Sequence, residues 1–201
     1  LRSHFESTEV FEELLSFESH QKFLEGTGSL ILDREQQIAY ASYSDRTEQE
    51  VIRAFEDLTA YTVIGFKAYQ NVDGQRLPIY HTNVMMSIGD HFALICAEAI
   101  DDVMEREQVL ETLRKQSKEI ILISEYQLNN YAGNILQVKN KNNVCFIVMS
   151  TNAFRSLNPH QKQQLEKHGT LLHSNLTTIE MLGGGSARCM MAEIFLPTKE
   201  S

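Results

Sequence analysis

Hydrophobic and polar positions along this 201-residue chain repeat one order of predicted elements three times. In each unit, two short runs rich in Ile, Val, Phe and Tyr precede an amphipathic stretch, and a further apolar run follows it. Such runs are typical of strands, and apolar residues three and four positions apart are typical of a helix. The predicted strand, strand, helix and strand of the successive units cover residues 29–33, 38–44, 47–58 and 62–69; 83–89, 92–100, 104–116 and 119–124; and 134–140, 144–150, 159–169 and 170–176.

Residues at the ends and on the faces of the three helices support this assignment. Thr47 is expected to cap the first helix, and Pro159 suits the first turn of the third, where its missing N–H needs no partner. The predicted apolar stripes consist of Val51, Phe55 and Leu58 in the first helix and Val109, Leu110 and Leu113 in the second.

The units start about every fifty residues, a period typical of propellers and similar closed arrays. Ser29, Asn83 and Asn134 open the successive first strands, and Cys189 follows one further step along, where it is expected to open a fourth. A lone strand cannot close such an array. We therefore expect residues 1–201 to form a single α/β domain that is the C-terminal portion of a longer protein, an expectation that fits the absence of an initial Met.

Composition and charge narrow the classes of function. Hydrophobic residues make up 42% of the chain and charged residues 22%, as in ordinary soluble domains. A net charge of −9 disfavours nucleic acid and anionic membrane as partners. No apolar run is long enough to predict a transmembrane helix. We expect a cytoplasmic protein that acts on a small molecule, and a homo-oligomer is compatible with the sequence.

The three cysteines are odd in number and widely spaced, which disfavours disulfides and fits a reducing compartment. Cys96 and Cys145 stand in apolar runs, where a small buried hydrophobe is the usual interpretation. Cys189 differs because it follows the turn GGGSAR.

Candidate chemistry occupies the same position in successive units, at or just before the first strand. Glu25, His81 with Asn83, Asn134 and Cys189 share this position, and in a radial array they would converge near the axis. A Cys, a His and a Glu brought together supply a nucleophile, a base and an orienting carboxylate. Each residue alone is weak evidence for a catalytic site, since a His before a strand is usually structural. The hypothesis rests on their shared position in the repeat.

A metal site is a weaker interpretation of the same residues. Glu25, His81 and Cys189 are all ligand types, but the seven His include no close pair at metal-binding spacing. No GxSxG motif is present, and GGGSA lacks the Lys of a phosphate-binding loop. We expect neither a metal nor an organic cofactor.

These motifs resemble the guanidine-modifying, or pentein, superfamily of arginine deiminases, dimethylarginine dimethylaminohydrolases and amidinotransferases, and most of all the group labelled amidinotransferase or citrulline-utilisation hydrolase. The resemblance implies a five-bladed α/β propeller of ββαβ units, here lacking its N-terminal part. The segments that carry it are FLEGTGSLILDR, YASYSDRT, IYHTNVMMSIG, ISEYQLNNYAGNIL and IEMLGGGSARCMMAEIFLP.

The resemblance also implies roles. Cys189 resembles the nucleophile that attacks the guanidinium carbon, and His81 resembles the acid/base that protonates the leaving amine and activates water. Glu25 resembles the carboxylate that holds the guanidinium and the His. Arg46 resembles the arginine that binds a substrate α-carboxylate through its bidentate fork; from the residues alone it would be a surface ion pair.

Two departures from the family pattern bear on the substrate. Asn83 stands where arginine deiminases have an Asp, and an amide binds a guanidinium less strongly, which disfavours strict arginine deiminase activity. Asn134, in the same phase, is the other candidate for substrate contact. The N-terminal motif that supplies a guanidinium-binding Asp in the family is absent from these 201 residues.

Three functions remain open. The first is hydrolysis of a guanidino C–N bond through a covalent thiouronium intermediate, giving a ureido product such as citrulline. The second is transfer of the amidino group to an amine acceptor through the same intermediate. The third is a non-catalytic pentein-like binding scaffold. The first two differ in whether water or an amine attacks the covalent intermediate. Product analysis with and without an amine acceptor therefore separates them.

Overall fold

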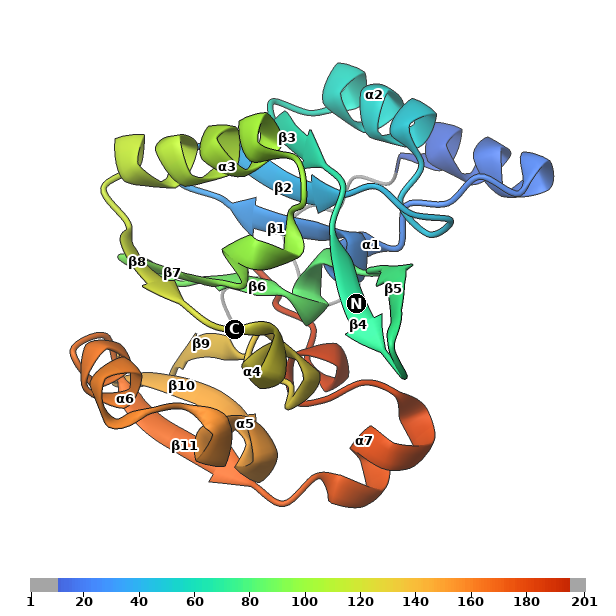
Figure 1. Cartoon of the computed structure of the whole chain (residues 1–201). Helices are drawn as coiled ribbons and strands as arrows, with labels where there is room; N and C mark the ends of the chain where they lie inside the picture. The colour runs from blue at the N-terminus through green and yellow to red at the C-terminus, as the bar shows by residue number, and fades with distance from the viewer. Residues whose placement is uncertain (1–10, 196–201) are drawn as a thin grey trace.

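The computed structural model describes residues 11–195, and these contain three mixed, three-stranded sheets of the same topology (Figure 1). In each sheet the first two strands are antiparallel and the third runs parallel to the second. The predicted order of strand, strand, helix and strand is therefore confirmed in all three units. The strands are β1 (Leu30–Asp33), β2 (Ile38–Ser42) and β3 (Thr62–Phe66); β6 (Met86–Ile88), β7 (Phe92–Ile95) and β8 (Glu119–Leu122); and β9 (Leu136–Lys139), β10 (Cys145–Ser150) and β11 (Thr170–Ser174).

Helices provide the crossovers that parallel strands require. These are α2 (Gln49–Leu58), α3 (Val103–Lys115), and the pair α5 (Thr151–Ser156) and α6 (Pro159–Glu166). In α3 the predicted stripe is buried, and Asp102 caps the helix by accepting from two backbone N–H groups. The cap predicted for α2 is wrong: Glu48 occupies the N-cap position, and the Thr47 hydroxyl instead bonds the Ser29 hydroxyl at 2.7 Å.

A hairpin that the periodicity does not predict lies between the first two units. Its strands, β4 (Tyr69–Val72) and β5 (Gln75–Pro78), form a sheet of their own. Asp73 and Gly74 make the two-residue turn, with φ of 50° and 79°. Asp-Gly between two strand-like runs is a hairpin signal because both turn positions need positive φ.

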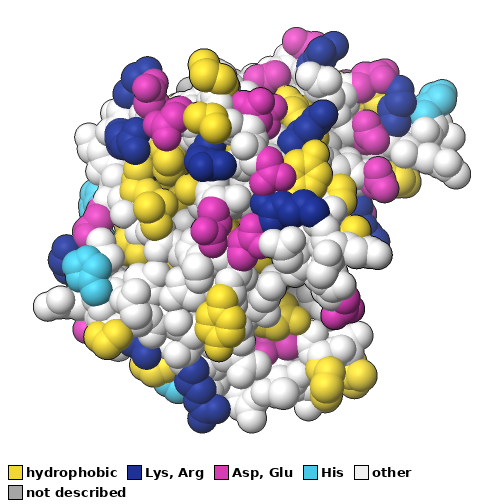
Figure 2. Space-filling model, viewed as in Figure 1, with side chains coloured by type: hydrophobic (Ala, Val, Ile, Leu, Met, Phe, Trp, Pro, Cys, Tyr) yellow, Lys and Arg dark blue, Asp and Glu magenta, His cyan; other side chains and the backbone are white. Residues whose placement is uncertain are grey.

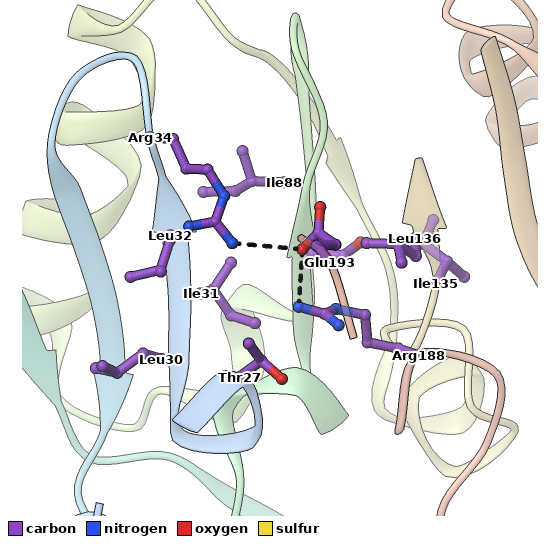
Figure 3. Close-up of a pocket in the computed structure, with 11 residues that line it drawn as sticks. Thr27, Leu30, Ile31, Leu32, Arg34, Ile88, Ile135, Leu136, Arg188 and Glu193 are labelled. Atoms are coloured by element: carbon purple, nitrogen blue, oxygen red, sulfur yellow. Dashed lines mark hydrogen bonds and ion pairs between the residues drawn. The ribbon is translucent and has the colours of Figure 1, made fainter. Parts of the chain in front are cut away.

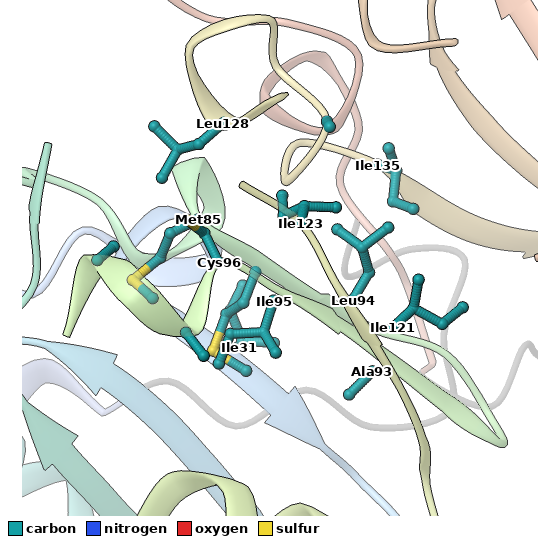
Figure 4. Packing of buried hydrophobic residues seen from close by; sticks show 14 of the residues in the cluster. Ile31, Met85, Ala93, Leu94, Ile95, Cys96, Ile121, Ile123, Leu128 and Ile135 are labelled. Carbon is teal, nitrogen blue, oxygen red and sulfur yellow. The ribbon is translucent and has the colours of Figure 1, made fainter. Parts of the chain in front are cut away.

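One main core joins the three units (Figure 4). It takes Ile31 from the first unit, Leu94 from the second and Ile147 from the third, all buried. Cys96 is fully buried in this core, as predicted, and burial raises the pKa of its thiol to about 12. The same prediction for Cys145 is wrong, because Cys145 is only partly buried.

The residues that lead into the first strands lie against one another, and Gly133 makes their approach possible. A Cβ on Gly133 would stand 2.3 Å from the carbonyl oxygen of Val84, so only glycine fits. This contact brings Asn134, at the start of the third unit, to Asn83, at the start of the second. The Asn134 side chain donates to the Asn83 carbonyl at 3.0 Å.

The predicted fourth strand is absent from the described residues. Cys189 lies instead in a short 3-10 helix, η4 (Arg188–Met190), and residues 191–195 form no strand. The physical reason is that no neighbouring strand pairs with this segment within residues 11–195. The described part of the chain holds three ββαβ units and no closed ring of sheets. The remaining elements are η1 (Glu12–His20), α1 (Gly26–Ser29), η2 (Thr82–Val84), η3 (Ala97–Ala99), α4 (Glu125–Asn129) and α7 (Thr177–Gly183).

Candidate active site

The single helical turn α1 places Glu25 beside Arg46. The backbone N–H of Glu25 and the hydroxyl of Ser29 both donate to the carbonyl of Arg46, at 3.3 and 2.8 Å. Gly28, in the same turn, allows the His81 ring to pack closely, because a Cβ there would lie 3.0 Å from the ring. Segments from two successive units therefore meet at this point.

Glu25, His81 and Arg46 form one hydrogen-bonded cluster. The Glu25 carboxylate lies 2.6 Å from Nε2 of His81, and Nη1 of Arg46 donates to both carboxylate oxygens at 3.1 and 3.2 Å. Partial burial raises the pKa of Glu25, but hydrogen bonds from His81 and Arg46 outweigh that effect and hold the pKa below its ordinary value. The carboxylate is thus ionised near neutral pH and orients the imidazole, whose Nδ1 has no hydrogen-bond partner within residues 11–195.

Glu25→Gln is expected to remove a small pH-dependent part of the stability. Because folding lowers the pKa of Glu25 from 4.5, the carboxylate stabilises the fold above that pH and loses the effect as pH falls through the folded-state pKa. The loss should stay below about 1 kcal/mol, since solvent screens a side chain that is 36% exposed. Urea unfolding between pH 7 and pH 3 measures it, with Glu166→Gln as an exposed control. Identical pH profiles for the parent and Glu25→Gln would contradict this assignment.

Two amides surround the sulfur of Cys189. Nδ2 of Asn134 lies 3.2 Å from Sγ, and Nδ2 of Asn83 lies 3.6 Å from it. The orientation of the Asn134 amide is fixed because its oxygen accepts from the backbone N–H groups of Arg188 and Cys189, at 3.0 and 3.4 Å. The N–H groups of both amides can therefore donate to the sulfur.

The chain around Cys189 is held on both sides. Before it, Gly185 leaves room for the cysteine, since a Cβ there would approach Sγ to 3.3 Å. Behind this loop the buried carboxylate of Glu180 accepts from Ser186 at 2.7 Å. After it, Glu193 lies between the two arginines that Figure 3 shows pointing toward it, Arg188 at 3.2 Å and Arg34 at 3.8 Å.

A cavity of about 160 Å³ opens beside Cys189. Tyr80 forms one wall: its hydroxyl donates to the carbonyl of Gly184 at 3.0 Å, and its ring lies 4.9 Å from the ring of His81. Burial, and then the nearby Cys189, raise the pKa of Tyr80. The other lining residues are Gln70, Val84, Leu128, Asn129, Tyr131, Asn134, Gly184 and Gly185.

The structure therefore places the predicted residues in two adjoining groups. Glu25, His81 and Arg46 contact one another, and Cys189 contacts Asn83 and Asn134. No hydrogen bond joins His81 to Cys189. Between the two groups, Tyr80 packs against the His81 ring and bonds the Gly184 carbonyl, and the Asn83 amide donates to the carbonyl of Thr27 at 3.5 Å.

Sequence reasoning missed Tyr80, Tyr131, Gln70 and Asn129. Tyr80 directly precedes His81 in the motif IYHTN, and this adjacency was the available signal. Asn129 lies at the end of α4 and Gln70 on the hairpin, so nothing in the fifty-residue phase marks them.

Other kinds of site find little support in the part of the chain that the structure describes. Residues 11–195 hold no group of three His, Cys, Asp or Glu arranged for a metal ion, and no helix long and apolar enough to cross a membrane. All three cysteines are free. On the face shown in Figure 2, acidic and basic side chains are interspersed, with no continuous basic patch.

Comparison with known proteins adds the family. The model of N,N dimethylarginine dimethylhydrolase, eukaryotic, matches residues 1–196. No curated protein matches the chain.

Solved structures of low identity share the fold. ArgZ, an arginine dihydrolase from the ornithine-ammonia cycle in cyanobacteria, is 20% identical with a TM-score of 0.63, over 83% of this chain and 23% of that one. The N-terminal domain of ArgZ bound to substrate is 21% identical with a TM-score of 0.65, over 87% and 58%. AgrE with ornithine and NAD+ is 21% identical with a TM-score of 0.62, over 88% and 23%. The chain thus spans less than two thirds of each of these proteins.

Proposed function

This chain belongs to the N,N dimethylarginine dimethylhydrolase family, in the pentein superfamily of guanidine-modifying proteins, and from that premise we propose that it hydrolyses a guanidino C–N bond of an arginine-like substrate. One observation carries the proposal: Cys189 has two amide donors at its sulfur, 3.2 and 3.6 Å away, and borders a cavity whose wall residue Tyr80 packs against His81, the partner of Glu25. ArgZ, which shares this fold, is an arginine dihydrolase, and this supports the proposed substrate class.

The proposed reaction has two halves. The Cys189 thiolate attacks the guanidinium carbon, the C–N bond breaks, and the leaving nitrogen takes a proton from His81 to depart as ammonia or an amine. Water, deprotonated by His81, then attacks the S-bound carbon of the thiouronium intermediate. The C–S bond breaks, which restores the thiolate and releases a ureido compound such as citrulline.

The lack of a hydrogen bond between His81 and Cys189 fits this sequence of steps. The guanidinium would lie between the sulfur and the ring, so protons pass between His81 and the substrate nitrogen or water. A bound cation itself favours the thiolate, and so do the amides of Asn83 and Asn134.

Arg46 and Glu25 complete the proposed site. Glu25 bonds only Nη1 of Arg46. The other guanidinium nitrogens can therefore receive a substrate carboxylate at the rim. We infer further that the three ββαβ sheets form part of a five-bladed propeller, supported by their shared topology. Free cysteines support a reducing, cytoplasmic setting.

Product analysis tests the proposal. The full-length protein is incubated with L-arginine, agmatine and N-methylated arginines, with and without glycine or ornithine, and products are identified by mass spectrometry. We expect a ureido product whose yield does not depend on the acceptor. A new guanidino compound formed only with the acceptor would instead establish amidino transfer. If none of these guanidines gives either product or a Cys189 adduct, the non-catalytic binding scaffold is the function that remains.

A further inference from the structure

Among residues 11–195, the side chains that line the cavity beside Cys189 include no carboxylate, Lys or Arg. A guanidino amino acid carries a carboxylate and an ammonium group at the end remote from its guanidinium. With the guanidinium at Cys189, those charges must find partners at the mouth of the cavity. The backbone of Arg46 is linked to that of Tyr80, a wall residue of the cavity, because Ser44 accepts from the Arg46 backbone N–H at 3.2 Å and donates to the carbonyl of Tyr80 at 2.7 Å. Arg46 suits the carboxylate, so the ammonium requires an acceptor.

Most polar groups of the lining are already engaged. The hydroxyls of Tyr80 and Tyr131 donate to the carbonyls of Gly184 and Glu180, at 3.0 and 2.9 Å. Asn134 bonds Cys189 and the backbone through both ends of its amide.

Gln70 differs from these residues because, within the described part of the chain, its side-chain amide is free at both ends, whereas Asn129 has only its amide oxygen free. Gln70 is a half-buried lining residue whose side-chain amide has no hydrogen-bond partner within residues 11–195. Asn129, from α4, lines the cavity as well, and its Nδ2 donates to the carbonyl of Asn71 at 3.3 Å. That bond places Asn129 next to the strand that carries Gln70.

The hairpin that carries Gln70 is fixed to the rest of the protein. From β5, Arg76 pairs with Glu125 and, at 2.5 Å, with Asp101. From β4, the amide of Asn71 donates to the same Glu125 at 2.5 Å. Contacts from both strands hold Gln70 in place before any ligand binds, and a preorganised contact loses less entropy on binding.

We propose that Gln70 determines specificity by accepting a hydrogen bond from the α-ammonium group of the substrate, an inference that rests on the proposed function. The side-chain oxygen of Gln70 accepts from the ammonium, and Arg46 pairs with the carboxylate on the same α-carbon. The enzyme therefore selects guanidino compounds with a free α-amino-acid end, and discriminates against those whose α-amine is acylated.

Gln70→Leu in the full-length protein tests the assignment, with Gln75→Leu as control. Gln75 is the same residue type on the same hairpin, is exposed, and does not line the cavity. Steady-state rates are measured for the guanidino amino acid that the parent accepts and for its α-N-acetyl derivative. In Gln70→Leu we expect KM for the free amino acid to rise about tenfold or more, the size of a hydrogen bond to a charged group, with kcat nearly unchanged. The derivative should be unaffected, and Gln75→Leu should match the parent.

Gln70→Glu supplies a second measurement that survives if the leucine variant folds poorly. A carboxylate at this position keeps an acceptor for the ammonium, so the preference for the free amino acid should equal or exceed that of the parent. A Gln70→Leu protein with the parental preference, or a Gln70→Glu protein that loses it, overturns the role of Gln70 alone. A parent that turns over no guanidino compound overturns the proposed function instead.

Discussion

Cys189→Ser is expected to lower turnover of any guanidino substrate at least about a thousandfold while changing its dissociation constant little. A serine hydroxyl is a far weaker nucleophile than a thiolate near neutral pH, and no base contacts this position directly. Its oxygen can still accept from the amides of Asn83 and Asn134, so the shape of the pocket is retained. Product formation gives the rate, and titration calorimetry gives the affinity.

Cys145→Ser is the matched control, since Cys145 is also free but lies on β10 and lines no part of the cavity. It should turn over substrate like the parent, and only the parent and this control should react with substrate to form an S-linked adduct. Sustained multiple turnover by Cys189→Ser would falsify the covalent-cysteine mechanism.

His81→Ala is expected to trap the reaction part of the way through. Attack by Cys189 can persist because the bound guanidinium and the two amides still favour the thiolate. Proton transfer to the leaving nitrogen and from the attacking water should both slow, by about a hundredfold to ten-thousandfold, the usual contribution of general acid–base catalysis. If release of the adduct slows more than its formation, the adduct accumulates and intact-protein mass spectrometry detects it.

His160→Ala is the control because His160 is an exposed residue of α6, remote in the chain from either group of site residues. It should behave like the parent in rate and in mass. Parental rates in His81→Ala would remove His81 from the mechanism, whatever role its contact with Glu25 then has in stability.

The parts of the fold that could be predicted are those determined by short stretches of the sequence. Alternating and helical periodicities identify three strand–strand–helix–strand units, because each unit buries one face of its own elements. The predictions fail where contacts between residues remote in the chain decide the structure. Thr47 has the side chain of a helix cap, but its hydroxyl is used by Ser29, eighteen positions earlier. The run after Cys189 has the composition of a strand, yet a strand forms only beside a partner.

The site follows the same division. The phase of the repeat brought Cys189, Asn83 and Asn134 together correctly, because equivalent positions in stacked units lie close in space. The arrangement of Glu25 and His81 was likewise visible in advance. Tyr80 was not, since its contacts with the His81 ring and the Gly184 carbonyl depend on the path of a glycine-rich loop. Periodicity contains no information about such a path.

The β4–β5 hairpin shares no strand pairing with any of the three sheets. Its length and sequence can consequently change without breaking a ladder that supports Cys189 or His81. The hairpin thus contacts the remote end of the ligand, whereas the residues that break the bond lie on other segments. The two can change in sequence independently. Related proteins can therefore change the substrate they bind by altering about ten residues of this hairpin. A different hairpin can likewise be engineered into the chain while the catalytic residues stay unchanged.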